Sequence, residues 1–93
     1  MKVVYSAQAI EDLKALRSFI ATHNPDAAKR ISAELLNRIN HLIQFPEMGK
    51  QVATSPTPNI RDCIFGQYIV RYAIHKDAIS ILKIWHHNQQ RSI

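Results

Sequence analysis

Side chains capable of acid–base chemistry occur near the end of this sequence. Two adjacent histidines, His86 and His87, end an apolar segment rich in isoleucine, and an imidazole can act as a general acid or base near neutral pH. Consecutive residues of a strand point to opposite faces of a sheet, so we expect that the pair neither acts on one substrate atom nor chelates one metal ion. A structural role or a contact with a partner is therefore the favoured interpretation of both histidines.

Cations in the same region could meet an anionic partner. Arg61 precedes Asp62 and could form an ion pair with it or contact a partner protein. Arg71 shares strand parity with Ile69, which predicts an exposed sheet face that Arg71 shares with Lys83 or His86. The alternative is that both arginines are simply solvated. Nearby aromatic residues could stack on nucleobases, although aromatic residues of small sheets more often belong to a core or an interface; they are Phe65, Tyr68, Tyr72 and Trp85.

Three strands are expected to position these side chains. β-Branched and aromatic residues are dense after residue 59, and two short polar breaks, at Gly66-Gln67 and Lys76-Asp77, interrupt them. This pattern predicts an antiparallel meander joined by tight hairpins. Its expected strands are Ile60–Phe65, Tyr68–His75 and Ala78–His86.

Two amphipathic helices are expected before the meander. Apolar residues at helical spacing predict a first helix from Ala7 to about Thr22, with Ser6 as its N-cap. A second helix is predicted from Pro25 to about Gln44, because Asn24 suits an N-cap and proline suits the first helical position. So short a turn predicts a helical hairpin. Glu11 and Asp12 are expected on the solvated face of the first helix and not as a catalytic pair.

The predicted fold is α+β, with the element order β-α-α-β-β-β in a single domain over residues 1–93. A short strand at Lys2–Tyr5 is expected to pair along an edge of the meander, and Glu47–Pro58 is expected to be a loop. Both helices would cover one face of the sheet and leave the other open. An open face that is partly apolar and partly basic usually has a partner.

Composition narrows the possible partners and compartments. The chain has 93 residues, of which 46% are hydrophobic, and a formal net charge of +5, which is compatible with an anionic partner or simply with solubility. Cys63 is the single cysteine, so no internal disulfide is expected and a core thiol is the favoured interpretation. The absence of an apolar leader or a membrane-length segment predicts a cytoplasmic protein with no membrane partner.

The sequence resembles the RelE/ParE superfamily of toxins from bacterial type II toxin–antitoxin systems. No single piece of the resemblance is specific, but all occur in order across nearly the whole chain. The pieces are A-I-E-D-L-K-A-L-R-S-F-I-A, N-P-D-A-A-K-R, L-I-Q-F-P-E-M-G-K, I-R-D, Y-I-V-R-Y-A-I and I-S-I-L-K-I-W-H-H-N-Q. The resemblance implies a helical hairpin packed on a small twisted antiparallel sheet, which agrees with the fold predicted above.

The superfamily divides by mechanism, and the residues here favour its ParE-like branch. RelE-like members cleave mRNA on the ribosome, which needs a base, an acid and cations for the developing phosphate charge. The resemblance places Ile69 and Gln89 where two active-site arginines would lie, and Arg61 one position out of register with the RelE lysines. ParE-like members lack that catalytic set and poison DNA gyrase through protein contacts. Some ribonuclease members carry a catalytic histidine near His86, but ParE-like sequences commonly have a histidine there too.

The resemblance implies a toxin that inhibits DNA gyrase by binding and is neutralised by a cognate antitoxin, without cofactor or metal. Operator DNA would be contacted only through the antitoxin complex. One alternative is a ribosome-dependent mRNA endoribonuclease that uses Arg61, Arg71, His86 and His87. Another is a degenerate, non-toxic module that only binds the antitoxin. The residues expected to contact the antitoxin or the target are Arg61, Tyr68, Arg71, Lys83, Trp85 and His86.

Overall fold

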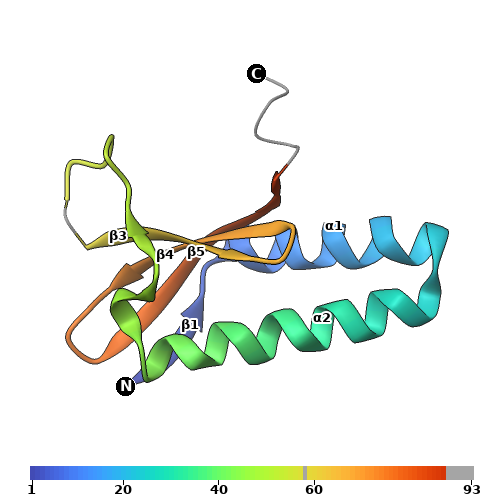
Figure 1. Ribbon diagram of the computed structural model, residues 1–93, viewed down its shortest axis with the longest axis horizontal. Coiled ribbons are helices and arrows are strands. Elements are labelled where there is room, and N and C mark those ends of the chain that lie inside the picture. The colour runs from blue at the N-terminus through green and yellow to red at the C-terminus, as the bar shows by residue number, and fades with distance from the viewer. Residues whose placement is uncertain (58, 88–93) are drawn as a thin grey trace.

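A computed structural model describes residues 1–57 and 59–87 of the chain. Two helices lie on one side of a five-stranded sheet (Figure 1). The helices are α1 (Ala7–His23) and α2 (Pro25–Asn40), and two short 3-10 helices follow, η1 (His41–Ile43) and η2 (Pro46–Met48). The strands are β1 (Lys2–Tyr5), β2 (Lys50–Gln51), β3 (Ile60–Phe65), β4 (Tyr68–Ile74) and β5 (Ala78–His86).

The sheet has the order β1-β5-β4-β3-β2. β3, β4 and β5 form the predicted antiparallel meander, and Gly66 takes a positive φ of 64° in the turn between β3 and β4. β1 pairs along the edge of β5, as predicted, but in parallel orientation. The sheet is therefore mixed and not wholly antiparallel. The predicted loop at Glu47–Pro58 is also interrupted, because Lys50 and Gln51 pair with β3 as the short strand β2.

Both helices begin where side-chain caps predict. The Ser6 hydroxyl oxygen accepts the Ala9 N–H at 3.0 Å, and the Asn24 side chain accepts the Ala27 N–H at 3.1 Å, which satisfies amides that have no partner within the first turn. α2 ends at Asn40, and the chain continues to Ile43 as 3-10 helix. The prediction that regular helix extends to about Gln44 was therefore too long, because the last turn tightens before Pro46.

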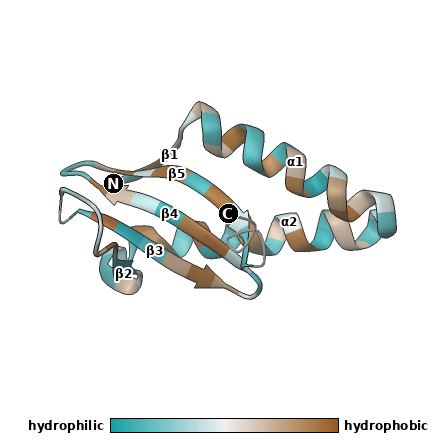
Figure 2. Cartoon of the chain, turned by 90° about the horizontal axis from the view of Figure 1, so that it is seen from above, coloured by the Kyte–Doolittle hydropathy of each residue, from teal (hydrophilic) through white to brown (hydrophobic). Residues whose placement is uncertain are grey.

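The core lies between the helical hairpin and the facing side of the sheet. Its largest fully buried side chain is Tyr72 on β4, which lies among isoleucines of β5 and residues of α2 and η1. No helix of the described residues lies on the opposite face, and Figure 2 views the molecule from that side. No helix within residues 1–57 and 59–87 is long and apolar enough to cross a membrane.

Candidate functional site

The open face of the sheet carries a cluster of charged residues around one tryptophan. Cross-strand pairing places Arg71 of β4 between Asp62 of β3 and Lys83 of β5. Arg71 donates from Nε to Asp62 Oδ1 at 2.8 Å and from Nη2 to Asp62 Oδ2 at 3.0 Å. The Arg71 Cζ lies 5.3 Å and the Lys83 Nζ 5.5 Å from the centroid of the Trp85 ring. The predicted grouping of Arg71 with Lys83 on one face is confirmed.

The ion pair controls what this cluster can bind. Its two-point geometry fixes the orientation of the guanidinium, and the hydrogen bonds to Asp62 raise the pKa of Arg71 above its ordinary value. Arg71 is therefore charged at every physiological pH, but a carboxylate occupies the edge that would otherwise hold a phosphate in two-point fashion. The Lys83 side chain also contacts the Trp85 ring, and Lys83 remains exposed. Together Asp62, Arg71 and Lys83 carry a net charge of +1.

His86 faces the helices and not the open face. It pairs with Tyr68 across β4 and β5, and the two rings meet edge to face with centroids 5.3 Å apart. The His86 Nε2 also lies 3.0 Å from Gln67 Oε1. The alternative in which Arg71 and His86 share a face is therefore wrong, because strand alternation puts Lys83 and Trp85 on one side and His86 on the other. His87, just beyond β5, donates its backbone N–H to Gln67 O at 2.8 Å.

Arg61 holds the loop before β2. Its Nη1 donates to Gly49 O at 2.7 Å and to Glu47 O at 3.4 Å. The predicted ion pair between Arg61 and Asp62 is wrong, because these neighbours lie on opposite faces of β3 and Asp62 is taken by Arg71. Arg61 thus has intramolecular partners, while its predicted contact with an external partner stays a prediction.

A groove lies between α1 and the outer edge of β5. Its cavity of about 580 Å³ is lined by Asp12, Ala15, Leu16, Phe19, Tyr68, Ile84, Trp85 and His86. We call it the α1–β5 groove. The Phe19 side chain is 68% exposed at its rim. Three of the predicted partner residues, Tyr68, Trp85 and His86, line this groove, whereas Arg71 and Lys83 contact the ring of Trp85.

Asp12 of α1 binds a backbone N–H on the outer edge of β5. Because β1 ends at Tyr5, the outer edge of β5 from Leu82 onward has no strand partner among the described residues. Asp12 Oδ2 accepts the Ile84 N–H at 2.9 Å, and the Ser6 hydroxyl donates to Leu82 O at 3.0 Å. The prediction that Asp12 is merely solvated is wrong: it is half-buried and connects α1 to β5. This contact spans 72 positions, so helical periodicity could not have revealed it.

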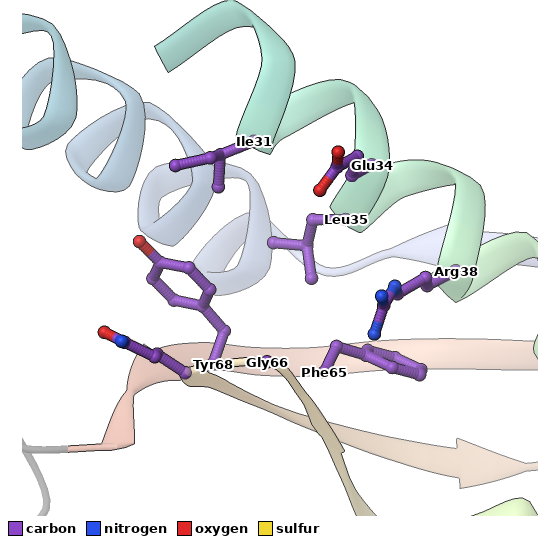
Figure 3. Close-up of a pocket in the computed structure, with 8 residues that line it drawn as sticks. Ile31, Glu34, Leu35, Arg38, Phe65, Gly66 and Tyr68 are labelled. Carbon is purple, nitrogen blue, oxygen red and sulfur yellow. The ribbon is translucent and has the colours of Figure 1, made fainter. Parts of the chain in front are cut away.

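A smaller cavity of about 300 Å³ lies between α2 and the turn from β3 to β4. Figure 3 shows Tyr68 at one end of it, with Arg38 reaching from α2 toward Phe65. Tyr68 thus lines both this cavity and the α1–β5 groove.

Cys63 lies on β3 and is the single cysteine of the chain. The Cys63 side chain is buried, as predicted, and burial raises the pKa of its thiol, which disfavours the reactive thiolate. In the part of the chain that the structure describes, no three His, Cys, Asp or Glu side chains are grouped to hold a metal ion. Gln89, which the resemblance places at an arginine position, lies outside the described residues.

Comparison with known proteins identifies the family. Residues 3–91 match the model of the ParE toxin of the type II toxin–antitoxin system, parDE, so the chain belongs to this toxin family. Toxin RelE2 of Caulobacter vibrioides is 29% identical over 86 residues, covering 91% of this chain and 93% of that protein. Toxin RelE3 of the same bacterium is 30% identical over 88 residues, with 90% and 91% covered.

Solved structures share the fold. A structure described as the chromosomal ParDE toxin–antitoxin system from P. aeruginosa has a TM-score of 0.77 at 19% identity, covering 92% of this chain and 95% of that chain. The RelBE2 toxin–antitoxin complex from Mycobacterium tuberculosis has a TM-score of 0.68 at 22% identity, with 91% and 95% covered. The family match confirms the predicted superfamily, and these structures confirm the predicted α+β fold.

Proposed function

We propose that this protein is a toxin that inhibits DNA gyrase by binding to it and that a cognate antitoxin neutralises. The observation that carries this proposal is the two-point ion pair between Arg71 and Asp62. Cleavage of RNA through its 2′-hydroxyl requires a cation near the phosphate and an acid and a base around the same phosphorus atom. On the open face, the Asp62 carboxylate would repel a phosphate at the place where Arg71 could bind one.

Two of the other candidate nuclease residues, Arg61 and His86, do not converge on that place. Arg61 donates to the carbonyl oxygens of Glu47 and Gly49, and His86 lies on the helix-facing side of the sheet. A general acid or base must come within hydrogen-bond reach of its proton. This separation favours inhibition by binding over catalysis, in line with the match to the ParE toxin family.

Ribosome-dependent mRNA cleavage is the alternative, and the relatives named RelE2 and RelE3 favour it.

Gyrase inhibition and mRNA cleavage leave different products in cells. Expression without antitoxin should arrest growth in both cases. Gyrase inhibition predicts relaxed or linearised plasmid DNA before transcripts are shortened, whereas an endoribonuclease predicts shortened transcripts and plasmid of normal supercoiling. Plasmid topology on chloroquine gels and primer extension on an abundant mRNA, sampled together, separate them. Overexpression without growth arrest would instead indicate the non-toxic module.

The α1–β5 groove is the proposed docking site of the antitoxin. An apolar segment would cover Phe19, Tyr68 and Trp85, and acidic residues of the same segment would reach Lys83 and the outward side of Arg71. Folding of a disordered acidic segment onto such a groove is an established mode of recognition. Operator DNA would then be contacted only through the resulting complex.

The docking site has a direct test. Phe19→Asp should weaken antitoxin binding at least tenfold and leave growth arrest intact, because Phe19 is exposed and contributes little to the core. Ile10→Asp is a matched control, since Ile10 is also an exposed apolar residue of α1 but does not line the groove. Unchanged binding by Phe19→Asp, or equal loss in both variants, would place the antitoxin elsewhere.

A further inference from the structure

A second groove runs between the C-terminal end of α2 and the outer edge of β3. Its cavity of about 620 Å³ is lined by Arg38 of α2 and His41 of η1, by Met48 of η2 and Lys50 of β2, and by residues 62–65 of β3. We call it the α2–β3 groove. β2 pairs only with Arg61 and Asp62. Beyond Asp62, the outer edge of β3 therefore has no strand partner in the described chain.

The charges lining the α2–β3 groove favour an anionic partner. Arg38 and Lys50 are exposed, and neither side chain forms an ion pair or hydrogen bond with any residue in the described ranges. Asp62 is the acidic residue of the lining, and its carboxylate is bound by Arg71. Glu34 lies one helical turn before Arg38, toward Tyr68 (Figure 3). Glu34 does not line the α2–β3 groove, so both Arg38 and Lys50 are open to an anionic ligand there.

Exposed apolar side chains flank these cations. Ile64 is 63% exposed and Met48 is 48% exposed. Apolar surface beside unpaired cations on an open strand edge suits an extended peptide, which can add main-chain hydrogen bonds and place alternate side chains in different environments.

The loop that forms one wall is held in place. The Tyr72 hydroxyl donates to Pro46 O at 2.6 Å and accepts the Gly49 N–H at 2.8 Å, and Arg61 donates to Gly49 O. Met48 and Lys50 flank Gly49, so the backbone that carries them needs little ordering when a ligand binds. A wall that is already ordered lowers the entropic cost of association.

We propose that the α2–β3 groove binds an acidic peptide segment of a partner protein, extended along β3 in line with β2. Apolar side chains of the segment would contact Met48 and Ile64, and its carboxylates would meet Arg38 and Lys50. This site is separate from the α1–β5 groove, and it does not depend on gyrase being the target.

Fluorescence anisotropy with a labelled peptide of alternating glutamate and leucine tests the proposal. The peptide should bind saturably, and a peptide with lysine in place of glutamate should not. The double variant Arg38→Glu/Lys50→Glu should weaken binding at least tenfold. Lys29→Glu/Lys76→Glu has the same change in net charge at exposed sites outside the groove, and it should weaken binding less than threefold. Met48→Ser/Ile64→Ser should weaken it at least fivefold.

Three results would overturn the proposal. One is the lack of saturable binding to the wild-type protein, and another is an equal loss of affinity in both charge-reversal variants, which would indicate net charge alone. The third is tighter binding of a single-stranded RNA of similar length that the Arg38→Glu/Lys50→Glu variant abolishes, which would make the groove a nucleic-acid surface. Circular dichroism of each variant confirms that it is folded. Because neither gyrase nor antitoxin is present, failure here is distinguishable from failure of the proposed function.

Discussion

Replacement of Tyr72 by phenylalanine should destabilise the protein strongly, although it removes only one oxygen atom. The Tyr72 side chain is fully buried, and its hydroxyl connects β4 to the loop before β2 through Pro46 O and the Gly49 N–H. Phenylalanine fills the same space without the hydroxyl. The variant therefore leaves two backbone groups without their partner while it opens little cavity volume.

The expected cost follows from the burial of those two groups. Gly49 is buried, so its N–H has no access to water once the hydroxyl is gone, and an orphaned buried donor costs about 1–3 kcal/mol. Pro46 is half-buried, so its carbonyl can regain some hydration and its lost hydrogen bond costs about 1 kcal/mol. The free energy of unfolding should fall by about 3 kcal/mol, which lowers the melting temperature of a chain of this length by about 12 °C or more.

Urea denaturation followed by circular dichroism measures this cost. Tyr5→Phe is the control, because the half-buried Tyr5 hydroxyl has no hydrogen-bond partner among the described residues, and it should change the free energy of unfolding by less than about 0.5 kcal/mol. A Cβ on Gly49 would lie 2.6 Å from Tyr72 Oη and 2.9 Å from Asp62 O. Gly49→Ala should therefore cost less in the Tyr72→Phe background than alone. A Tyr72→Phe variant within about 0.5 kcal/mol of wild type would refute the reasoning.

Three further predictions concern stability, pH and toxicity. Asp12→Ala should lower the free energy of unfolding by about 1–2 kcal/mol, because the Ile84 N–H loses a charged acceptor. Glu11→Ala, on the exposed side of α1, should have little effect, and equal urea midpoints for both variants would contradict the contact. Burial raises the pKa of Cys63 and that of Tyr72 above their ordinary values. Well below about pH 8 both groups are protonated in the folded and unfolded states, so they add no pH dependence there. Above about pH 8 the unfolded chain releases their protons first, so stability should fall as the pH rises. Urea midpoints from pH 7 to 10.5 measure this, and Cys63→Ala/Tyr72→Phe should flatten the decline; a wild-type midpoint constant to pH 10.5 would contradict it. His86→Ala and His87→Ala should retain growth arrest in an induction assay, whereas loss of toxicity with antitoxin binding intact would favour a nuclease.

Local sequence patterns predicted most of the fold. β-Branched residues and polar turns predicted the meander, and Ser6, Asn24 and Pro25 predicted where both helices begin, because strand alternation and helix caps are local properties. The parallel pairing of β1 with β5 joins opposite ends of the chain, and β2 is only two residues long. Neither leaves a local signal strong enough to predict it.

The candidate site was less predictable from the sequence because the residues that contact one another in it are distant along the chain. Arg71 pairs with Asp62 across two strands, Asp12 reaches Ile84 from the helical hairpin, and Arg61 holds a loop 12 residues away. One error was avoidable. The alternation of side chains that separates His86 from His87 also separates Arg61 from Asp62, and it excludes an ion pair between strand neighbours.

The most direct test of the proposed function is the supercoiling of relaxed plasmid by purified DNA gyrase, with this protein titrated in free of antitoxin. Dose-dependent loss of supercoiling is the expected result, relieved by the cognate antitoxin and unchanged in the His86→Ala variant. Linear plasmid after protease digestion would show that the toxin traps the cleaved-DNA intermediate. Full supercoiling in the presence of excess folded protein that still binds its antitoxin would contradict the proposed function.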